Sequence, residues 1–319
     1  MRHRAAPDAV GRRHRNAVTL LIAGITSALG RAVAERALAR GVRVRALVRD
    51  PARIPATLSS LLAGVITGDA RDRSAADAAL AGCDAVFSCV GASVLPTFGR
   101  GWRGFGAVDW PANRNLIDAA RAAGASRFVY LSVFHHPDMR RLAYVDAHER
   151  VVDHLRASGL DFAVLRPTGF HSALASYVDL AARGSIPEVG RGAVRTNPIA
   201  DEDLADLCDA ALESSDPALE IACGGPEVLT RRAIGELAFA ATGRAPRFIP
   251  MPALLMRAAA LIGRPLHPRI AQFAAFLAHI STVELIAPLH GTRFLAGAFT
   301  DRARSLGAPA REPSGISAS

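Results

Sequence analysis

The sequence predicts an α/β protein whose core is a doubly wound parallel sheet. Short apolar runs alternate with segments of helical periodicity along the first half of the chain. Because parallel strands are joined by right-handed crossovers through helices, this alternation is typical of a sheet that carries helices on both faces. Six strands are expected at residues 18–23, 42–48, 65–69, 84–91, 127–132 and 160–165, and the helices between them at residues 28–40, 74–81, 111–123 and 145–157.

The first strand leads through a glycine turn into the first helix. Residues 18–23 are apolar and have the length of a buried strand, and Gly24 and Gly30 bracket the turn that follows. Gly41 suits the C-terminal cap of the helix. Such a turn aims backbone N–H groups and the positive end of the helix dipole at one point, which attracts a pyrophosphate. We therefore expect a dinucleotide site around residues 24–30.

The spacing of this turn departs from the usual dinucleotide fingerprint in one place. The pattern is Gly24-x-x-Ser27-x-x-Gly30, whereas the fingerprint has a glycine at the position of Ser27. That glycine normally lets the backbone approach the pyrophosphate. A serine is small enough to fit, and its hydroxyl is able to bond a phosphate. The alternative interpretation is an ordinary helix-start turn.

Composition excludes several classes of function. The chain has 319 residues, half of them hydrophobic, and a formal net charge of +9. It contains no lysine, so all its basic side chains other than histidine are arginines, and many lie in the first fifteen residues. We attribute this bias to overall composition and expect no nucleic-acid partner. Cys83, Cys89, Cys208 and Cys223 lack metal-ligand spacing, which predicts reduced cysteines in a cytoplasmic protein and no metal site.

The sequence divides into four parts. We expect a disordered basic arm at residues 1–16, a dinucleotide-binding core at 17–167, a substrate-covering portion with further core elements at 168–304, and a disordered tail at 305–319. In the third part, periodicity predicts helices at residues 201–213 and 231–242 and a strand at residues 219–223.

Residues 250–286 are mostly apolar and helical in pattern. The apolar run at 254–262 is interrupted by Arg257 and falls short of the ~20 residues that cross a membrane. The segment indicates a hydrophobic ligand or a weak contact with a membrane surface, and it is equally consistent with a core element.

Several motifs resemble the atypical short-chain dehydrogenase/reductases, specifically the NmrA-like and divinyl-reductase-like branch. The resemblance covers roughly residues 18–248 and implies a Rossmann-type fold with an NAD(P) cofactor; its motifs say little about the reaction. The motifs lie at residues 24–31, 46–51, 68–69, 112–120, 127–132, 165–170, 197–199, 203–205 and 224–230.

By this resemblance, Arg49 would meet the 2′-phosphate of the adenosine and Asp69 the adenine amine. An arginine at the end of the second strand suits a phosphate dianion, whereas an acid there would hold a ribose diol. The alternatives are a solvated arginine and a turn aspartate. The other residues implied to line the dinucleotide are Thr26, Ala28, Leu29, Cys89, Val90, Gly91 and Pro167.

Ser132, Tyr144 and His148 form the candidate catalytic group. Members of this superfamily ordinarily pair a serine at the end of the fifth strand with Tyr-x-x-x-Lys about a dozen positions later. Here Tyr144 lies twelve residues after Ser132, and His148 replaces the lysine. Tyrosine and histidine at i and i+4 share one helix face. The resemblance implies that His148 takes over the bond to the nicotinamide ribose and, if protonated, part of the charge effect; the alternative is a pair of core polar groups.

Three functions stay open at this point. The first is an NADPH-dependent reductase of a small hydrophobic substrate with a carbonyl, quinone or activated C=C group, NAD being the alternative cofactor. The second is an NmrA-type redox sensor that binds NAD(P) without turnover. The third is an epimerase or isomerase that retains its cofactor. The sequence leaves the substrate and the oligomeric state open.

Overall fold

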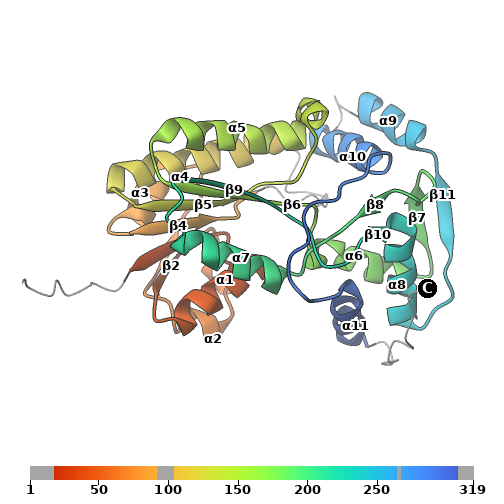
Figure 1. Ribbon diagram of the computed structural model, residues 1–319, viewed down its shortest axis with the longest axis horizontal. Coiled ribbons are helices and arrows are strands. Elements are labelled where there is room, and N and C mark those ends of the chain that lie inside the picture. Colours follow the sequence, from red (N-terminus) through yellow and green to blue (C-terminus); the bar gives the residue numbers. More distant parts are fainter. Residues whose placement is uncertain (1–17, 92–103, 264–266, 308–319) are drawn as a thin grey trace, which may run out of the picture.

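The computed structural model describes residues 18–91, 104–263 and 267–307, and its centre is a seven-stranded parallel sheet (Figure 1). The expected basic arm and most of the expected tail therefore lie outside the described residues. The strand order is β3-β2-β1-β4-β5-β6-β9, which confirms the predicted Rossmann-type fold. The strands are β1 (Thr19–Ala23), β2 (Arg43–Val48), β3 (Gly64–Thr67), β4 (Ala85–Ser88), β5 (Arg127–Leu131), β6 (Phe162–Pro167) and β9 (Ala218–Cys223).

Helices cover both faces of the sheet because successive side chains of each strand point to opposite sides. In β1, Leu20 and Ile22 enter one apolar core, while Leu21 and Ala23 enter the other. The first core packs against α1 (Ala28–Ala39), α2 (Ala56–Ser59) and α7 (Asp201–Glu213). The second packs against α3 (Arg73–Leu80), α4 (Asp109–Ala123) and α5 (Ala143–Ser158) (Figure 1).

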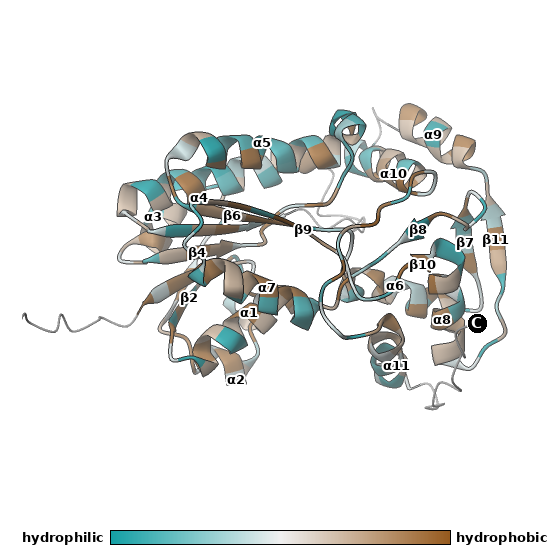
Figure 2. Cartoon of the chain, viewed as in Figure 1, coloured by the Kyte–Doolittle hydropathy of each residue, from teal (hydrophilic) through white to brown (hydrophobic). Residues whose placement is uncertain are grey.

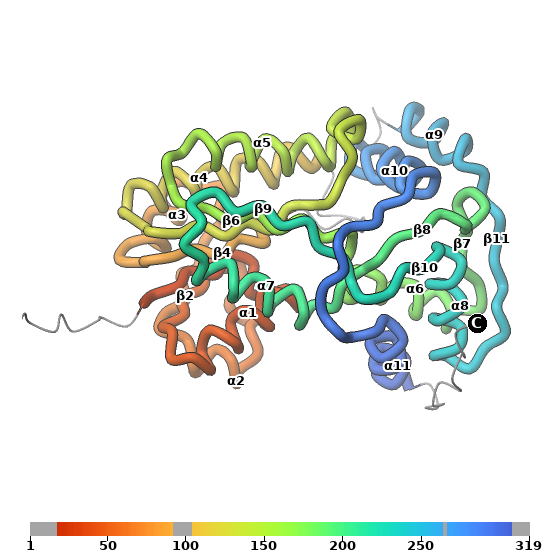
Figure 3. The backbone as a smooth tube through the Cα atoms, viewed as in Figure 1, coloured from red at the N-terminus to blue at the C-terminus, as the bar shows by residue number. Residues whose placement is uncertain are grey.

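Two elements of the sheet layers come from far along the chain. After β6 the chain leaves the sheet, then returns to place α7 beside α1 and β9 beside β6 (Figure 3). The buried guanidinium of Arg127 in β5 secures this return, since its Nε donates to the carbonyl of Ala211 at 2.9 Å. The expected helix at residues 201–213 and strand at 219–223 thus belong to the sheet layers.

The remaining C-terminal elements form a smaller group beside the sheet (Figure 1). The strand pairs are β7 (Ile186–Val189) with β11 (Phe248–Met251), parallel, and β8 (Arg195–Thr196) with β10 (Leu229–Thr230), antiparallel. Helices α6 (His171–Ala182), α8 (Arg231–Thr242) and α11 (Leu295–Ser305) enclose an apolar cluster that contains Val178, Ile234 and Phe299. Helices α9 (Ala253–Ile262) and α10 (Pro268–Ile280) pack on each other, and short 3-10 helices lie at η1 (Pro51–Arg53), η2 (Phe105–Ala107) and η3 (Pro137–Arg141).

Buried polar side chains tie residues 287–293 to the segments around them. Asn197 is fully buried and exchanges two hydrogen bonds with the backbone of Ala287, its Nδ2 donating at 2.8 Å and its Oδ1 accepting at 3.0 Å. Asp203 of α7 accepts from the backbone N–H groups of Thr292 and Arg293. Among the helices of the described ranges, none has the length and apolar character needed to span a bilayer.

Candidate cofactor and active site

The candidate site lies at the carboxyl edge of the sheet, between β1 and β4. The strand order reverses at this point, because β2 and β3 continue on one side of β1 and β4 to β9 on the other. Parallel sheets bind their ligands in the crevice outside such a switch point. Gly24 follows β1 directly and Cys89 follows β4, so the predicted glycine turn occupies this position.

Both glycines of the turn are required by close packing. Gly24 has a φ of +103°, and a Cβ there would lie 2.6 Å from the Sγ of Cys89. A Cβ on Gly30 would lie 2.3 Å from the carbonyl oxygen of Gly24. Burial raises the pKa of the Cys89 thiol to about 11, so this side chain is a neutral packing group.

Ser27 has a structural role in the turn, and its expected bond to a phosphate stays a prediction. It is the N-cap of α1: its Oγ accepts from the N–H of Gly30 at 3.0 Å and donates to the carbonyl of Gly24 at 2.9 Å. The hydroxyl proton is therefore already used within the turn. The N–H groups of Ala28 and Leu29, in contrast, have no hydrogen-bond partner among the described residues.

These two N–H groups make the helix start suitable for an anion. They belong to the first turn of α1, where N–H groups lack acceptors within the helix, and no acidic side chain lies in that turn. Two residues before Ala28, the carbonyl oxygen of Thr26 accepts a hydrogen bond from the guanidinium of Arg31 at 2.9 Å. The chain thus holds a tight backbone cradle of the kind that fits a pyrophosphate.

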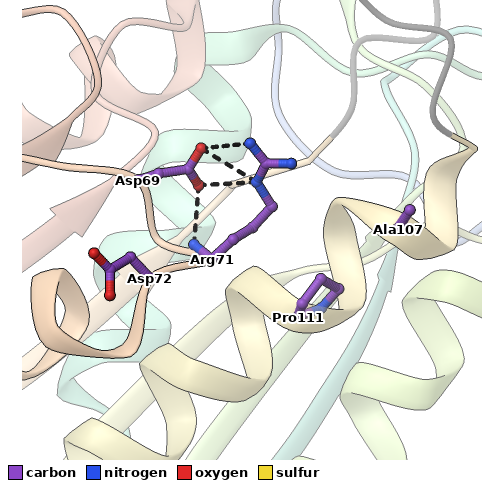
Figure 4. A pocket seen from close by; sticks show the side chains of 5 residues that line it. All are labelled: Asp69, Arg71, Asp72, Ala107 and Pro111. Carbon is purple, nitrogen blue, oxygen red and sulfur yellow. Dashed lines mark hydrogen bonds and ion pairs between the residues drawn. The ribbon is translucent and has the colours of Figure 1, made fainter.

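Arg49 and Asp69 follow the ends of the neighbouring strands β2 and β3, and their environments differ. Arg49 is exposed and forms no hydrogen bond or ion pair with another described residue. The carboxylate of Asp69 is bound by Arg71, with Nη2 to Oδ2 at 2.7 Å and Nε to Oδ1 at 3.1 Å (Figure 4). Hydrogen bonds from Arg71 lower the pKa of Asp69, and the charge of Arg49 adds to this effect. Our sequence reasoning missed Arg71.

An open depression of about 390 Å³ adjoins this ion pair (Figure 4). Asp69 and Arg71 form one wall, and Pro111 of α4 forms another. A guanidinium that is held flat by a carboxylate offers a planar surface on which an aromatic base is able to stack. The remaining lining residues are Asp72 and Ala107.

The loop after β4 is held by a buried asparagine. Asn113 of α4 donates from its Nδ2 to the carbonyl of Val90 at 3.0 Å and accepts at its Oδ1 from the hydroxyl of Ser88 at 2.6 Å. Gly91 lies against α4, where a Cβ would be 3.3 Å from the Oδ1 of Asp109. These contacts set the path of residues 89–91 beside the turn. Pro167, the last residue of β6, lies buried at the same edge and accepts from the N–H of Phe134.

Ser132 follows the end of β5, and Tyr144 lies at the start of α5. Ser132 follows β5 directly and is buried, and its Oγ has no hydrogen-bond partner in the described part of the chain. The ring of Tyr144 lies between Phe105 and Phe276, with centroid distances of 5.0 and 4.7 Å. Val133 and Tyr144 belong to one apolar cluster, which places the two candidate residues in the same region.

His148 is buried and is bonded to a tyrosine that our sequence reasoning missed. Its Nδ1 lies 2.7 Å from the hydroxyl of Tyr130, a fully buried residue of β5. Burial lowers the pKa of His148 to about 4, so the ring is neutral at pH 7. The expected contribution of a positive charge by His148 is therefore not supported.

The bond to Tyr130 also assigns the histidine tautomer. Burial raises the pKa of Tyr130 well above its ordinary value, so the hydroxyl keeps its proton. A buried O–H without an acceptor is costly, and Nδ1 of His148 is its hydrogen-bond partner in the described ranges. We therefore assign Tyr130 as the donor to Nδ1. The proton of the neutral imidazole then lies on Nε2, which becomes a hydrogen-bond donor.

A charged cluster next to His148 joins the middle of α5 to the sheet. Glu149 is buried and accepts from Arg166 of β6 and, at 3.1 Å, from Nε2 of His135. Burial by itself would raise the pKa of Glu149, but the bonds from His135 and Arg166 outweigh it and lower the pKa to about 2. Arg166 also binds Glu220 of β9 at 3.2 Å. These groups are far apart in the sequence, and no local pattern marks them as a cluster.

A family model described as NAD(P)H-binding matches residues 24–215 of the chain. Among curated proteins, the chloroplastic divinyl chlorophyllide a 8-vinyl-reductase of Zea mays is 32% identical over 258 residues, which is 75% of this chain and 63% of the relative. A photosystem II assembly factor of Synechocystis is 28% identical over 155 residues, 49% of this chain and 46% of that protein. The chain thus spans less than two thirds of the length of these relatives.

Solved structures share the fold at low identity. The triphenylmethane reductase of Citrobacter has a TM-score of 0.68 at 16% identity, covering 90% of this chain and 99% of its own. An NADPH-dependent quinone oxidoreductase of Escherichia coli, complexed with NADPH, has a TM-score of 0.64 at 21% identity with the same coverage. The family match, the reductase relative and the common fold confirm the predicted resemblance. This chain belongs to the NAD(P)H-binding family.

Proposed function

We propose that this protein is an NADPH-dependent reductase of a small hydrophobic substrate with a carbonyl, quinone or activated C=C group. The observation that carries the proposal is the buried Ser132 hydroxyl, which has no hydrogen-bond partner among the described residues. The next residue, Val133, belongs to the same apolar cluster as Tyr144. A buried polar atom of this kind usually has a functional reason. The reductases among the relatives and the NAD(P)H-binding family model support the proposal.

The backbone cradle and its neighbours fit an NADP cofactor. In this proposal the N–H groups of Ala28 and Leu29 hold the pyrophosphate, and Arg49 binds the 2′-phosphate. Arg71 supports the adenine, with Asp69 holding its guanidinium in place. When bound, the cofactor supplies a hydride. The expected contacts of Thr26, Cys89, Val90, Gly91 and Pro167 remain part of the same proposal.

Each of the three catalytic candidates has a distinct task. Tyr144 donates a proton: burial, and next the charge of Asp109, raise its pKa, so its hydroxyl is protonated at neutral pH. Ser132 donates a hydrogen bond to the acceptor oxygen of the substrate. His148 acts as a neutral donor through Nε2 and orients the nicotinamide ribose. The rings of Phe105 and Phe276 beside Tyr144 favour an apolar substrate.

A second candidate function is NAD(P) binding without turnover. The specific observation in its favour is that His148, which stands in the place of the usual lysine, is neutral, and the chain has no lysine. The charge of Asp109 acts in the opposite direction to the usual lysine, because it makes the tyrosine a weaker acid. One group of relatives comprises assembly factors, which fits a role outside catalysis.

The test is oxidation of NADPH with a panel of enones, quinones and aldehydes, combined with a cofactor titration. We expect turnover by the natural protein and a loss of about a hundredfold or more in Tyr144→Phe, with cofactor affinity unchanged. Binding of NADPH without oxidation by any acceptor would favour the second function. Nucleotide that copurifies and is not consumed would favour an epimerase or isomerase. Equal turnover in Tyr144→Phe and the natural protein would remove Tyr144 as the proton donor.

A further inference from the structure

Helix α9 carries an unusual concentration of exposed aliphatic side chains. Leu254 is 74% exposed, Leu255 60%, Leu261 67% and Ile262 70%. Ala260 is the buried residue of this ten-residue helix. Figure 2 shows α9 as a largely apolar element at the outer corner of the molecule, beyond α10. Large apolar side chains gathered on one surface mark a contact site far more often than single exposed ones.

The surroundings of α9 are basic. No aspartate or glutamate occurs from residue 237 to residue 283, a stretch that contains five arginines. Arg257 of α9 is exposed. Burial, and next the positive charges of Arg141 of η3 and of Arg257, lower the pKa of His279 in α10, so both arginines lie near this histidine. Asp138 of η3 lies close to this region, but it pairs with Arg141 at 3.4 Å. Because Arg141 is paired, the exposed positive charge at the apolar helix is that of Arg257.

We propose that α9 is a membrane-surface helix that lies on an anionic lipid bilayer, with its leucines among the acyl chains and Arg257 at the headgroups. A short helix with exposed aliphatic residues and adjacent arginines has the chemistry of such interfacial helices. A symmetric contact with a second copy fits less well, because it would place the same arginines of both copies opposite each other. This role is separate from the proposed reductase activity.

The experiment is vesicle co-sedimentation of the full chain at constant ionic strength. Vesicles of phosphatidylcholine alone are compared with vesicles that contain 30% phosphatidylglycerol, a composition of about one anionic lipid in three. The test variant is Leu255→Glu with Leu261→Glu, both at exposed positions. The matched control is Leu61→Glu, since Leu61 is 63% exposed and lies after α2, away from α9. Far-UV circular dichroism and thermal unfolding verify that each variant is folded.

We expect the natural chain and Leu61→Glu to bind the anionic vesicles, and the α9 double variant to bind at least tenfold more weakly. This factor is expected because the double variant loses the burial of two leucine side chains among the acyl chains. Arg257→Gln should weaken binding to anionic vesicles and leave the weak binding to neutral vesicles unchanged. Equal binding of the control and the double variant would overturn the proposal, because the contact would then lie elsewhere on this basic chain. A dimer in solution that only the double variant dissociates would assign α9 to a second copy and also overturn it.

Discussion

Replacing His148 by glutamine should remove a defined part of the acid sensitivity of the fold. His148 titrates near pH 4 in the folded protein, because it is buried, and near its ordinary value of 6.5 in the unfolded chain. The unfolded chain therefore binds more protons at this position between pH 4 and pH 6.5. By proton linkage, the free energy of unfolding falls as the pH decreases through this window and is fully retained above it.

The size of the effect follows from these two values. Between pH 7 and pH 5 the unfolded chain becomes almost fully protonated at His148, while the folded chain binds about a tenth of a proton. Integration over this range gives a loss of about 2 kcal/mol in the free energy of unfolding. Glutamine does not titrate, and its side-chain oxygen still accepts a hydrogen bond from Tyr130. The natural chain should therefore lose about 2 kcal/mol more than His148→Gln over this range.

Urea unfolding at pH 7, 6 and 5, followed by circular dichroism, measures this difference. His135→Gln provides a control of opposite sign: the hydrogen bond that His135 donates to Glu149 raises the pKa of His135, so its stabilising contribution is lost as the pH rises. The natural chain should accordingly gain stability relative to His135→Gln on acidification. Parallel pH curves for the natural chain and His148→Gln would refute the reasoning, because they would mean that His148 is hydrated and titrates normally in the folded protein.

Two further predictions concern the cofactor cradle. Arg49→Ala should weaken NADPH binding by about 1.5–3 kcal/mol and spare NADH, since a charge-assisted bond to the 2′-phosphate is lost; calorimetric titration checks this, with the exposed Arg121→Ala as a control for net charge. An equal loss for both nucleotides would contradict it. Gly30→Ala should destabilise the fold by about 1–3 kcal/mol, because its Cβ would lie 2.3 Å from a backbone oxygen. The control is Gly297→Ala in α11, where a Cβ would meet no atom within 4 Å, and this variant should instead stabilise the fold by about 0.5–1 kcal/mol. Urea unfolding measures both variants, and equal changes in the free energy of unfolding would contradict the prediction.

The sequence by itself determined the elements whose signals are local. The predicted helices at residues 201–213 and 231–242 coincide with α7 and α8. The glycine turn was recognisable for the same reason, because a strand, a tight turn and a helix start are consecutive in the chain. Predicted strands differ from the observed ones by a few residues at their ends; the sixth extends to Pro167 because it pairs with β9.

Only the tertiary structure decided how side chains distant in the sequence meet. The spacing of Tyr144 and His148 correctly indicates one helix face, and the two rings are 4.9 Å apart. The charge of His148 was not readable from that spacing, because it depends on burial and on Tyr130, which comes from another element. The cluster of Glu149 and Arg166 likewise exists because α5 packs across β6. A pattern of residue types reports which face of an element is apolar, whereas the pKa and the partner of a polar group depend on what the fold places against it.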